Sequence, residues 1–199
     1  MTKNYKSLII LILFALQMVS SWAQKPFVFH NKKFRIAQFT DLHWDAKSPK
    51  CDSTRTTILN ILQREKPDIA ILTGDVVTEK PYEKGWKQII EIFETARTPF
   101  VVTMGNHDAE HFSRDEIYRM LFASKFYSGL PSPKEISGNG NCALPIYDNN
   151  TANAKPKAVL YCIDSNDYQP DKDLGEYDWI HFDQIEWYRR TSEAFTLQN

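Results

Sequence analysis

The sequence predicts an α/β fold in which strands and helices alternate along the chain. Three short apolar segments, at residues 34–40, 69–73 and 100–104, have the length and composition of buried strands. Two intervening segments, at about residues 53–65 and 82–97, repeat their apolar residues at helical spacing. Strands that alternate with helices at this spacing are joined by right-handed crossovers and lie parallel. The three strands should therefore form one parallel sheet.

The N-terminal residues have the layout of a secretory signal peptide. Lys3 and Lys6 precede an apolar run at residues 8–16, and small residues stand at positions −3 and −1 before Gln24. The run is well short of the roughly 20 apolar residues that a transmembrane helix needs. We therefore expect residues 1–23 to be cleaved, the mature chain to reach the periplasm or the medium, and no stable membrane insertion.

The composition is that of an ordinary globular domain. The chain has 199 residues, of which 42% are hydrophobic and 25% charged, and its formal net charge is −1. Such a chain buries a core as one unit, so we expect a single domain over residues 24–199. The near-neutral balance offers no basic field for nucleic acid and no polybasic patch for a membrane surface.

The first strand leads into Asp41-Leu42-His43. Because residues i and i+2 of a strand point to the same side, Asp41 and His43 are expected to converge just beyond the strand. A carboxylate and an imidazole together suit zinc, iron or manganese. An isolated pair of this kind can equally be a turn with a surface histidine, so its weight depends on the other strands. Trp44, the next residue, either lines a pocket or packs.

The first helix is expected to begin at a cap formed by Asp52 or Ser53 and to end before Pro67. The strand after it, residues 69–73, is continuously apolar, as is typical of a strand buried on both faces. It ends in Gly74-Asp75. Glycine lets the backbone approach a ligand closely, and the aspartate falls at the same sheet edge as the first pair.

The second helix carries apolar residues at positions i, i+3, i+4 and i+7, which predicts packing against the sheet. These residues are Trp86, Ile89, Ile90 and Phe93. The third strand ends in Gly105-Asn106-His107-Asp108, which supplies an amide, an imidazole and a carboxylate. Ligands of open α/β sheets bind at the carboxyl ends of the strands. Three strands thus bring candidate site residues to one edge, namely Asp41, His43, Asp75, Asn106 and His107.

The remainder of the chain predicts a helix, a hairpin and a second helix. Ser113 caps the first of these helices, and a surface loop follows at residues 127–141, which are rich in glycine, proline and serine. Residues 142–147 and 158–163 are expected to pair as a hairpin. The final helix places Ile185 and Tyr188 on one face.

The three cysteines leave the disulfide pattern open. Cys142 and Cys162 lie in the two strands of the predicted hairpin and Cys51 lies in a loop, so a bridge would leave one thiol over. Their spacing matches no zinc site. Disulfides persist in exported proteins, whereas buried unpaired cysteine is common in strands, so the sequence alone assigns no disulfide.

Taken together, three motifs resemble those of the calcineurin-like metallophosphoesterases. Asp41-Leu42-His43, Gly74-Asp75 and Gly105-Asn106-His107-Asp108 match the family's D-x-H, G-D and G-N-H-[DE] blocks in order, each after a strand. The chain is most similar in character to the exported branch related to purple acid phosphatases. The resemblance implies a layered fold of mixed β-sheets flanked by helices. This chain would hold the N-terminal βαβαβ half, a β-hairpin and a helix, with the second sheet incomplete.

The resemblance also implies a role for each residue at the edge. Asp41 and His43 would bind the first metal, Asp75 would bridge both metals, and Asn106 would bind the second. The cofactors would be two divalent or trivalent transition-metal ions, namely manganese, iron or zinc. A hydroxide bridging the two ions would attack a phosphate ester, while His107 would contact the phosphoryl oxygens or protonate the leaving group. Substrates would be phosphorylated small molecules or phosphodiesters.

The sequence departs from the family pattern in two places. Thr78 stands where purple acid phosphatases carry a tyrosine ligand, so a coloured iron–tyrosinate centre is not expected. No G-H-x-H block precedes Asn199, so we expect the chain to be the N-terminal part of a longer domain.

Asp108 would not bind a metal itself but would orient the loop or His107. The alternative function is a catalytically inactive domain that serves as a binding or structural module.

Overall fold

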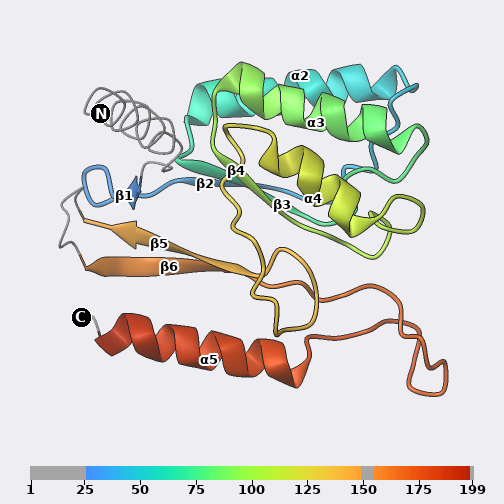
Figure 1. Ribbon diagram of the computed structural model, residues 1–199. Helices are drawn as coiled ribbons and strands as arrows, with labels where there is room; N and C mark the ends of the chain where they lie inside the picture. Colours follow the sequence, from blue (N-terminus) through green and yellow to red (C-terminus); the bar gives the residue numbers. More distant parts are fainter. Residues whose placement is uncertain (1–25, 149–154, 198–199) are drawn as a thin grey trace, which may run out of the picture.

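The fold consists of two three-stranded sheets stacked on each other and flanked by helices. The computed structural model describes residues 26–148 and 155–197 (Figure 1). In chain order the elements are β1 (Phe27–Val28), β2 (Ile36–Phe39), α2 (Lys50–Glu65), β3 (Ile69–Thr73), α3 (Tyr82–Ala96), β4 (Phe100–Thr103), α4 (Arg114–Phe122), β5 (Cys142–Tyr147), β6 (Pro156–Cys162) and α5 (Phe182–Leu197). Helices α2, α3 and α4 cover one sheet, and α5 lies beyond the other (Figure 1). The predicted layered α/β fold is confirmed.

The predicted signal peptide, residues 1–23, lies outside the described residues. Among the helices that the structure describes, none has the length and apolarity that a membrane span requires.

The first sheet is parallel throughout, in the order β2-β3-β4. Phe39 pairs with Leu72, and Thr73 pairs with Thr103, so the carboxyl ends of the three strands lie level. The predicted parallel sheet is confirmed, and β3 has the predicted bounds. Level strand ends matter because they set the loops that carry the candidate site residues side by side.

The helix α2 begins earlier than predicted. It starts at Lys50, after Pro49, and neither Asp52 nor Ser53 caps it. Proline fixes a φ that already suits a helix, so the chain turns into α2 without a side-chain cap. Cys51, which was predicted to lie in a loop, therefore lies in the first turn of this helix.

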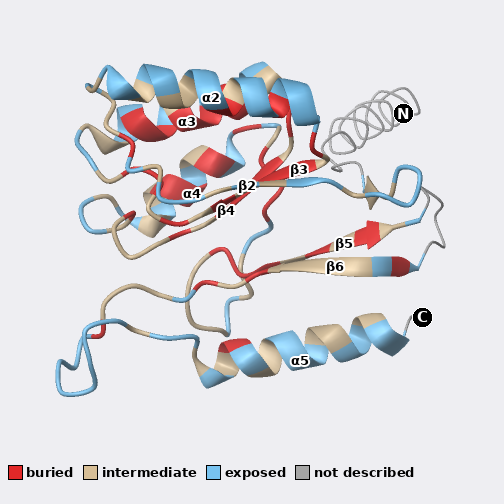
Figure 2. Ribbon diagram, turned by 180° about the vertical axis from the view of Figure 1, so that it is seen from behind, coloured by how far each residue is buried: buried red, intermediate tan, exposed pale blue. Residues whose placement is uncertain are grey.

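The helix α3 packs its apolar stripe into the core beside the first sheet. The predicted stripe of apolar residues on α3 is buried, and Figure 2 shows the inner side of the helix in the colour of buried residues. The ring of Phe93 stacks on that of Phe100 in β4 at 4.7 Å between centroids. Trp44 is 1% exposed in the same core and donates its Nε1–H to Gln88 Oε1 at 2.8 Å. Trp44 thus packs and does not line a pocket.

The predicted surface loop at residues 127–141 is partly wrong. Tyr127 and Ser128 are buried, because Tyr127 forms a parallel bridge with Phe100 and its ring packs on that residue at 5.5 Å. At the other end Asn141 is buried and accepts the backbone N–H of Asp164 through Oδ1. Glycine and proline predicted the irregular backbone correctly, but aromatic and amide side chains at its ends bury it.

The second sheet has the order β1-β5-β6. The strands β5 and β6 pair antiparallel, which confirms the predicted hairpin, while β1 pairs parallel with β5. Side chains alternate between the faces of a strand, so β3 and β4 pack against both layers. Ile69 and Val101 face the second sheet and form a core cluster with Leu144, separate from the cluster under the helices.

The final helix α5 lies largely exposed along the second sheet (Figure 2). Tyr161 of β6 packs edge-on against Trp187 and Tyr188. Ile185 and Tyr188, which were predicted to share a face, are still 42% and 41% exposed. The buried residue of the helix is Gln184, whose amide donates to Asn141 Oδ1 and to the backbone oxygen of Asp164.

Candidate metal centre

The loops after β2 and β3 are joined by backbone hydrogen bonds that continue the strand pairing. Asp41 N–H donates to the backbone oxygen of Gly74 at 3.1 Å, and His43 N–H donates to that of Asp75 at 3.0 Å. The two polar strand ends therefore run side by side. Their relative position is set by the backbone alone, before any ion or substrate is considered.

Asp41, His43 and Asp75 lie close enough to share one metal ion. One ligand atom from each lies within 4.8 Å of the others. Nε2 of His43 is 4.0 Å from Oδ1 of Asp41 and 4.0 Å from Oδ2 of Asp75. Two carboxylates and an imidazole form a donor set that suits manganese, iron or zinc. These residues therefore fit one transition-metal ion of the kind that the sequence implied.

The three candidate ligands share an unusual backbone conformation. Asp41, His43 and Asp75 all have positive φ, at 52°, 43° and 51°. Positive φ disfavours residues with a Cβ, costs about 1–3 kcal/mol each, and concentrates at functional sites. Asp41 and His43 were predicted to converge by strand alternation. That prediction is wrong, because strand β2 ends at Phe39 and both residues lie beyond it. Both residues take the left-handed conformation instead of the extended one.

Two glycines let the loops after β3 and β4 come into contact. Gly74 has a φ of 90°, and a Cβ on it would stand 2.9 Å from the Cα of Gly105. A Cβ on Gly105 would collide with Oδ1 of Asp75. The backbone amide N–H of His107 donates to that same oxygen at 3.2 Å. Only glycine at these two positions lets the Asp75 carboxylate sit between the loops.

Asp108 holds the same two loops together from inside the core. It is 1% exposed, and its Oδ1 accepts the backbone N–H groups of Val76 at 2.7 Å and Val77 at 3.0 Å. Its Oδ2 accepts the N–H of Gly105 at 2.9 Å. Burial raises the pKa of Asp108, although the three backbone hydrogen bonds oppose that shift. Asp108 thus orients the loops, one of the two predicted roles.

Thr78 and His43 meet on the far side of the imidazole ring. The Thr78 hydroxyl lies 3.4 Å from Nδ1 of His43. This contact occupies Nδ1, the ring nitrogen that faces away from the carboxylates. The other ring nitrogen, Nε2, faces Asp41 and Asp75. A partner on the second ring nitrogen is the usual way in which a protein fixes a metal-binding histidine.

Asn106 and His107 lie beside the three acidic and imidazole ligands. The rings of His43 and His107 are 6.1 Å apart between centroids. The Nδ2 of Asn106 donates to the Tyr168 hydroxyl at 2.9 Å, so its Oδ1 is left as the atom that can bind a metal. The structure thus brings all five predicted site residues to one edge.

Glu110 is a neighbour of His107 that the sequence reasoning missed. Nδ1 of His107 donates to Oε1 of Glu110 at 2.8 Å. This hydrogen bond raises the pKa of His107, against burial, which lowers it. Hydrogen bonds from Tyr168 and then from His107 lower the pKa of Glu110. Glu110 follows His107 by three residues, and this short spacing could have indicated a contact between them. Nothing in the sequence indicated that Tyr168 lies at the site.

Comparisons with known proteins relate the chain to one family. Residues 34–197 match the calcineurin-like phosphoesterase family. The chain is 29% identical over 187 residues to probable inactive purple acid phosphatase 29 of Arabidopsis thaliana, which covers 82% of this chain and 48% of that protein. It is 26% identical over 185 residues to phosphatase DCR2 of Saccharomyces cerevisiae, which covers 81% of this chain and 32% of that protein.

A second plant relative extends the same picture. The chain is 26% identical over 200 residues to probable inactive purple acid phosphatase 14 of Arabidopsis thaliana, which covers 84% of this chain and 48% of that protein. The chain thus spans half or less of the length of these curated relatives.

Proposed function

The chain belongs to the calcineurin-like phosphoesterase family, and we propose on that basis that it hydrolyses phosphate esters with two transition-metal ions at this sheet edge. The observation that supports the proposal most strongly is the cluster of Asp41, His43 and Asp75, whose ligand atoms lie within 4.8 Å of one another. The substrates would be phosphorylated small molecules or phosphodiesters.

Each site residue has a separate task in this proposal. Asp41 and His43 would hold the first ion, and Asn106 would offer a neutral oxygen to the second. Asp75 has two carboxylate oxygens with several lone pairs, so it can serve both ions while it accepts the His107 N–H. When bound, the two cations activate water and neutralise charge on the phosphate.

His107 is the group proposed to act on the substrate. Its Nδ1 is bonded to Glu110, so Nε2 is the nitrogen that can reach a phosphoryl oxygen or the leaving group. The hydrogen bond to Glu110 raises the pKa of His107 in the metal-free protein, and an imidazole that carries a proton on Nε2 can donate it to a departing alkoxide. Glu110 keeps the ring in one orientation and balances its positive charge.

A second candidate function is a metal-binding or structural domain without catalysis. The observation that favours it is that two relatives carry the word inactive in their names. A metal-binding domain would also need a metal at Asp41, His43 and Asp75, whereas a purely structural domain would not, so turnover separates the catalytic function from both forms of the alternative.

Hydrolysis assays with p-nitrophenyl phosphate and its bis-ester, in the presence of manganese, iron, zinc or cobalt ions, test the proposal. We expect metal-dependent turnover that Asp75→Asn abolishes and His107→Ala lowers by about 10²–10⁴-fold. Asp52→Asn, an exposed change on α2, is the matched control and should retain activity. Metal binding without turnover would favour the non-catalytic domain, and the absence of both would overturn the proposal.

We also propose that the protein is exported, on the basis of the signal-peptide pattern at residues 1–23. The mass of the protein recovered from the periplasm or medium should correspond to a chain that begins at Gln24. Recovery of the chain from the cytoplasm with its first 23 residues intact would contradict export.

A further inference from the structure

Tyr168 makes direct contact with two of the site residues although it is far from them in the sequence. Its hydroxyl accepts the Nδ2–H of Asn106 at 2.9 Å and donates to Oε1 of Glu110 at 2.7 Å. It also lies 3.4 Å from Nδ1 of His107, and the two rings meet edge to face at 6.4 Å. One hydroxyl group therefore touches the proposed second-metal ligand and the proposed proton donor.

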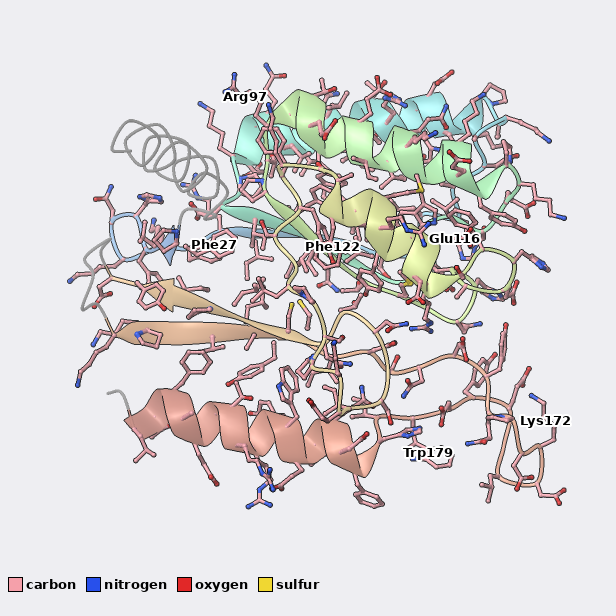
Figure 3. The ribbon with its side chains drawn as sticks, viewed as in Figure 1. Phe27, Arg97, Glu116, Phe122, Lys172 and Trp179 are labelled. Carbon is pink, nitrogen blue, oxygen red and sulfur yellow. The ribbon has the colours of Figure 1, made fainter. Side chains whose placement is uncertain are left out.

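Tyr168 is held in place by the segment that carries it, residues 165–181, which we call the tyrosine loop. Tyr168 forms an antiparallel bridge with Tyr177, and the two rings stack at 5.8 Å. Asp178 N–H donates to the backbone oxygen of Asp167 at 3.0 Å next to the bridge. In Figure 3, Lys172 marks the outer end of the loop and Trp179 marks its return toward α5.

The base of the tyrosine loop is fixed to α4 by buried charge. Arg114, at the start of α4, forms an ion pair with Asp164, whose side chain is 1% exposed. The same guanidinium lies 3.5 Å from a carboxylate oxygen of Asp167. Separating a buried ion pair leaves an uncompensated buried charge and is strongly destabilising, so this pair resists movement of the loop base away from α4. Tyr168, next to Asp167, is thus anchored to the helix that follows the G-N-H-D loop.

We propose that Tyr168 is a positioning residue of the metal centre, which fixes the Asn106 amide with its oxygen free for the second metal and fixes Glu110 against His107. An asparagine amide can present either its oxygen or its nitrogen, and only the oxygen binds a cation. The Tyr168 hydroxyl has one proton, which goes to the Glu110 carboxylate, so it can only accept from Asn106. This chain of donors and acceptors selects the amide orientation that the metal needs.

The inference rests on the proposed function, because it assigns Tyr168 a task in the same metal site. Its test is titration of Co²⁺ into the protein with visible absorption as the readout, since the cobalt spectrum reports the ligands directly. Four variants are compared with wild type: Tyr168→Phe, Asn106→Ala, Asp75→Asn and Tyr177→Phe. Tyr177→Phe removes the equivalent hydroxyl from the stacked ring and serves as the matched control.

Tyr168→Phe should weaken the Asn106-dependent cobalt binding by about 10–100-fold, the usual effect of losing a group that orients a ligand. Asn106→Ala should have the same effect, and Tyr177→Phe should have none. If Tyr168→Phe matches wild type while Asn106→Ala and Asp75→Asn bind weakly, the positioning role is overturned and the proposed function stands. If Asn106→Ala matches wild type, Asn106 is not a ligand and the inference falls. If wild type binds no Co²⁺, the proposed function falls, and this inference falls with it.

A separate observation concerns Cys142 and Cys162. They stand directly opposite each other in the antiparallel pairing of β5 and β6, and both are buried. Directly opposite residues have Cα atoms about 4.5–5.5 Å apart, which falls within the range that a disulfide requires. Cys51 lies in α2 and packs with the other core cluster.

We infer that Cys142 and Cys162 form a disulfide under oxidising conditions, while Cys51 stays a thiol. The two thiols give two protons and two electrons to an external disulfide such as oxidised glutathione, which is released as two thiols. The protein is refolded in a buffer that contains oxidised glutathione, and its free thiols are then counted in denaturant. Wild type should have one free thiol per chain, and Cys51→Ser should have no free thiol. Three thiols per chain in wild type, or two in Cys51→Ser, would overturn the pairing.

Discussion

Replacing Asp108 by asparagine tests how the two site loops are held together. In wild type the two carboxylate oxygens accept three backbone N–H groups at 2.7, 3.0 and 2.9 Å. An asparagine oxygen can still accept from Val76 and Val77, but its NH₂ group then faces the N–H of Gly105. Two donors meet, so one hydrogen bond is lost: the partly buried N–H of Gly105 and the buried NH₂ group of the new side chain both lack an acceptor there.

The cost can be worked out from those contacts. An unsatisfied buried donor costs about 1–3 kcal/mol. Asparagine also removes a buried charge, which offsets part of that cost because burial disfavours the ionised form. We therefore expect a net loss of about 2 kcal/mol in the free energy of unfolding. With a urea m-value of about 2 kcal/mol/M, the denaturation midpoint should fall by about 1 M.

The assay is urea denaturation of wild type, Asp108→Asn and the control Asp173→Asn, followed by circular dichroism. Asp173 is exposed in the tyrosine loop, so its replacement should leave the midpoint unchanged. A midpoint for Asp108→Asn equal to that of the control would refute the account of Asp108 as the link between the two loops.

Three further predictions concern the site and its supports. Glu110→Gln should lower the raised pKa of His107, as measured by NMR titration of its ring protons in the metal-free protein. Because the pKa is raised on folding, protonated His107 stabilises the fold at a pH below its pKa in the unfolded chain. That contribution is lost as the pH rises through the pKa of the folded protein. An unchanged pKa would remove Glu110 as the cause. Gly105→Ala should abolish cobalt binding, because the new Cβ displaces the Asp75 carboxylate, and tight binding would contradict that collision. Ser113→Ala should lower the free energy of unfolding by about 1 kcal/mol through loss of the cap on α4, and no loss would show that the cap is dispensable.

The parts of the fold that local chemistry controls were predicted from the sequence. The run at Ile69–Thr73 is continuously apolar between Pro67 and Gly74, and it became β3 with those bounds. The stripe on α3 is buried as its spacing required. In both cases the pattern depends on nearest neighbours, which a sequence displays directly.

The parts that depend on distant partners were missed. The strand β1 has two residues and exists only because it pairs with β5, more than a hundred residues later. Tyr127 is buried by its contact with Phe100, which glycine and proline content could not reveal. Tyr168 enters the site because Arg114 anchors the tyrosine loop. Long-range contacts of this kind leave no local pattern.

The sequence predicted where the candidate site lies, but only part of the predicted cause is correct. The polar residues after three parallel strands do meet at one edge, as the alternation of strands and helices predicted. Strand alternation does not account for the convergence of Asp41 and His43, because both residues lie beyond β2 and have positive φ. Aspartate and histidine adopt positive φ more often than most residues but less readily than glycine, so the sequence does not predict it.

The most direct test of the account is anomalous diffraction from crystals of the protein soaked in Mn²⁺. We expect an anomalous peak in contact with a carboxylate oxygen of Asp41, Nε2 of His43 and a carboxylate oxygen of Asp75, and the loss of that peak in Asp75→Asn. Crystals that hold Mn²⁺ elsewhere on the protein and show no peak among these three residues would contradict the metal centre.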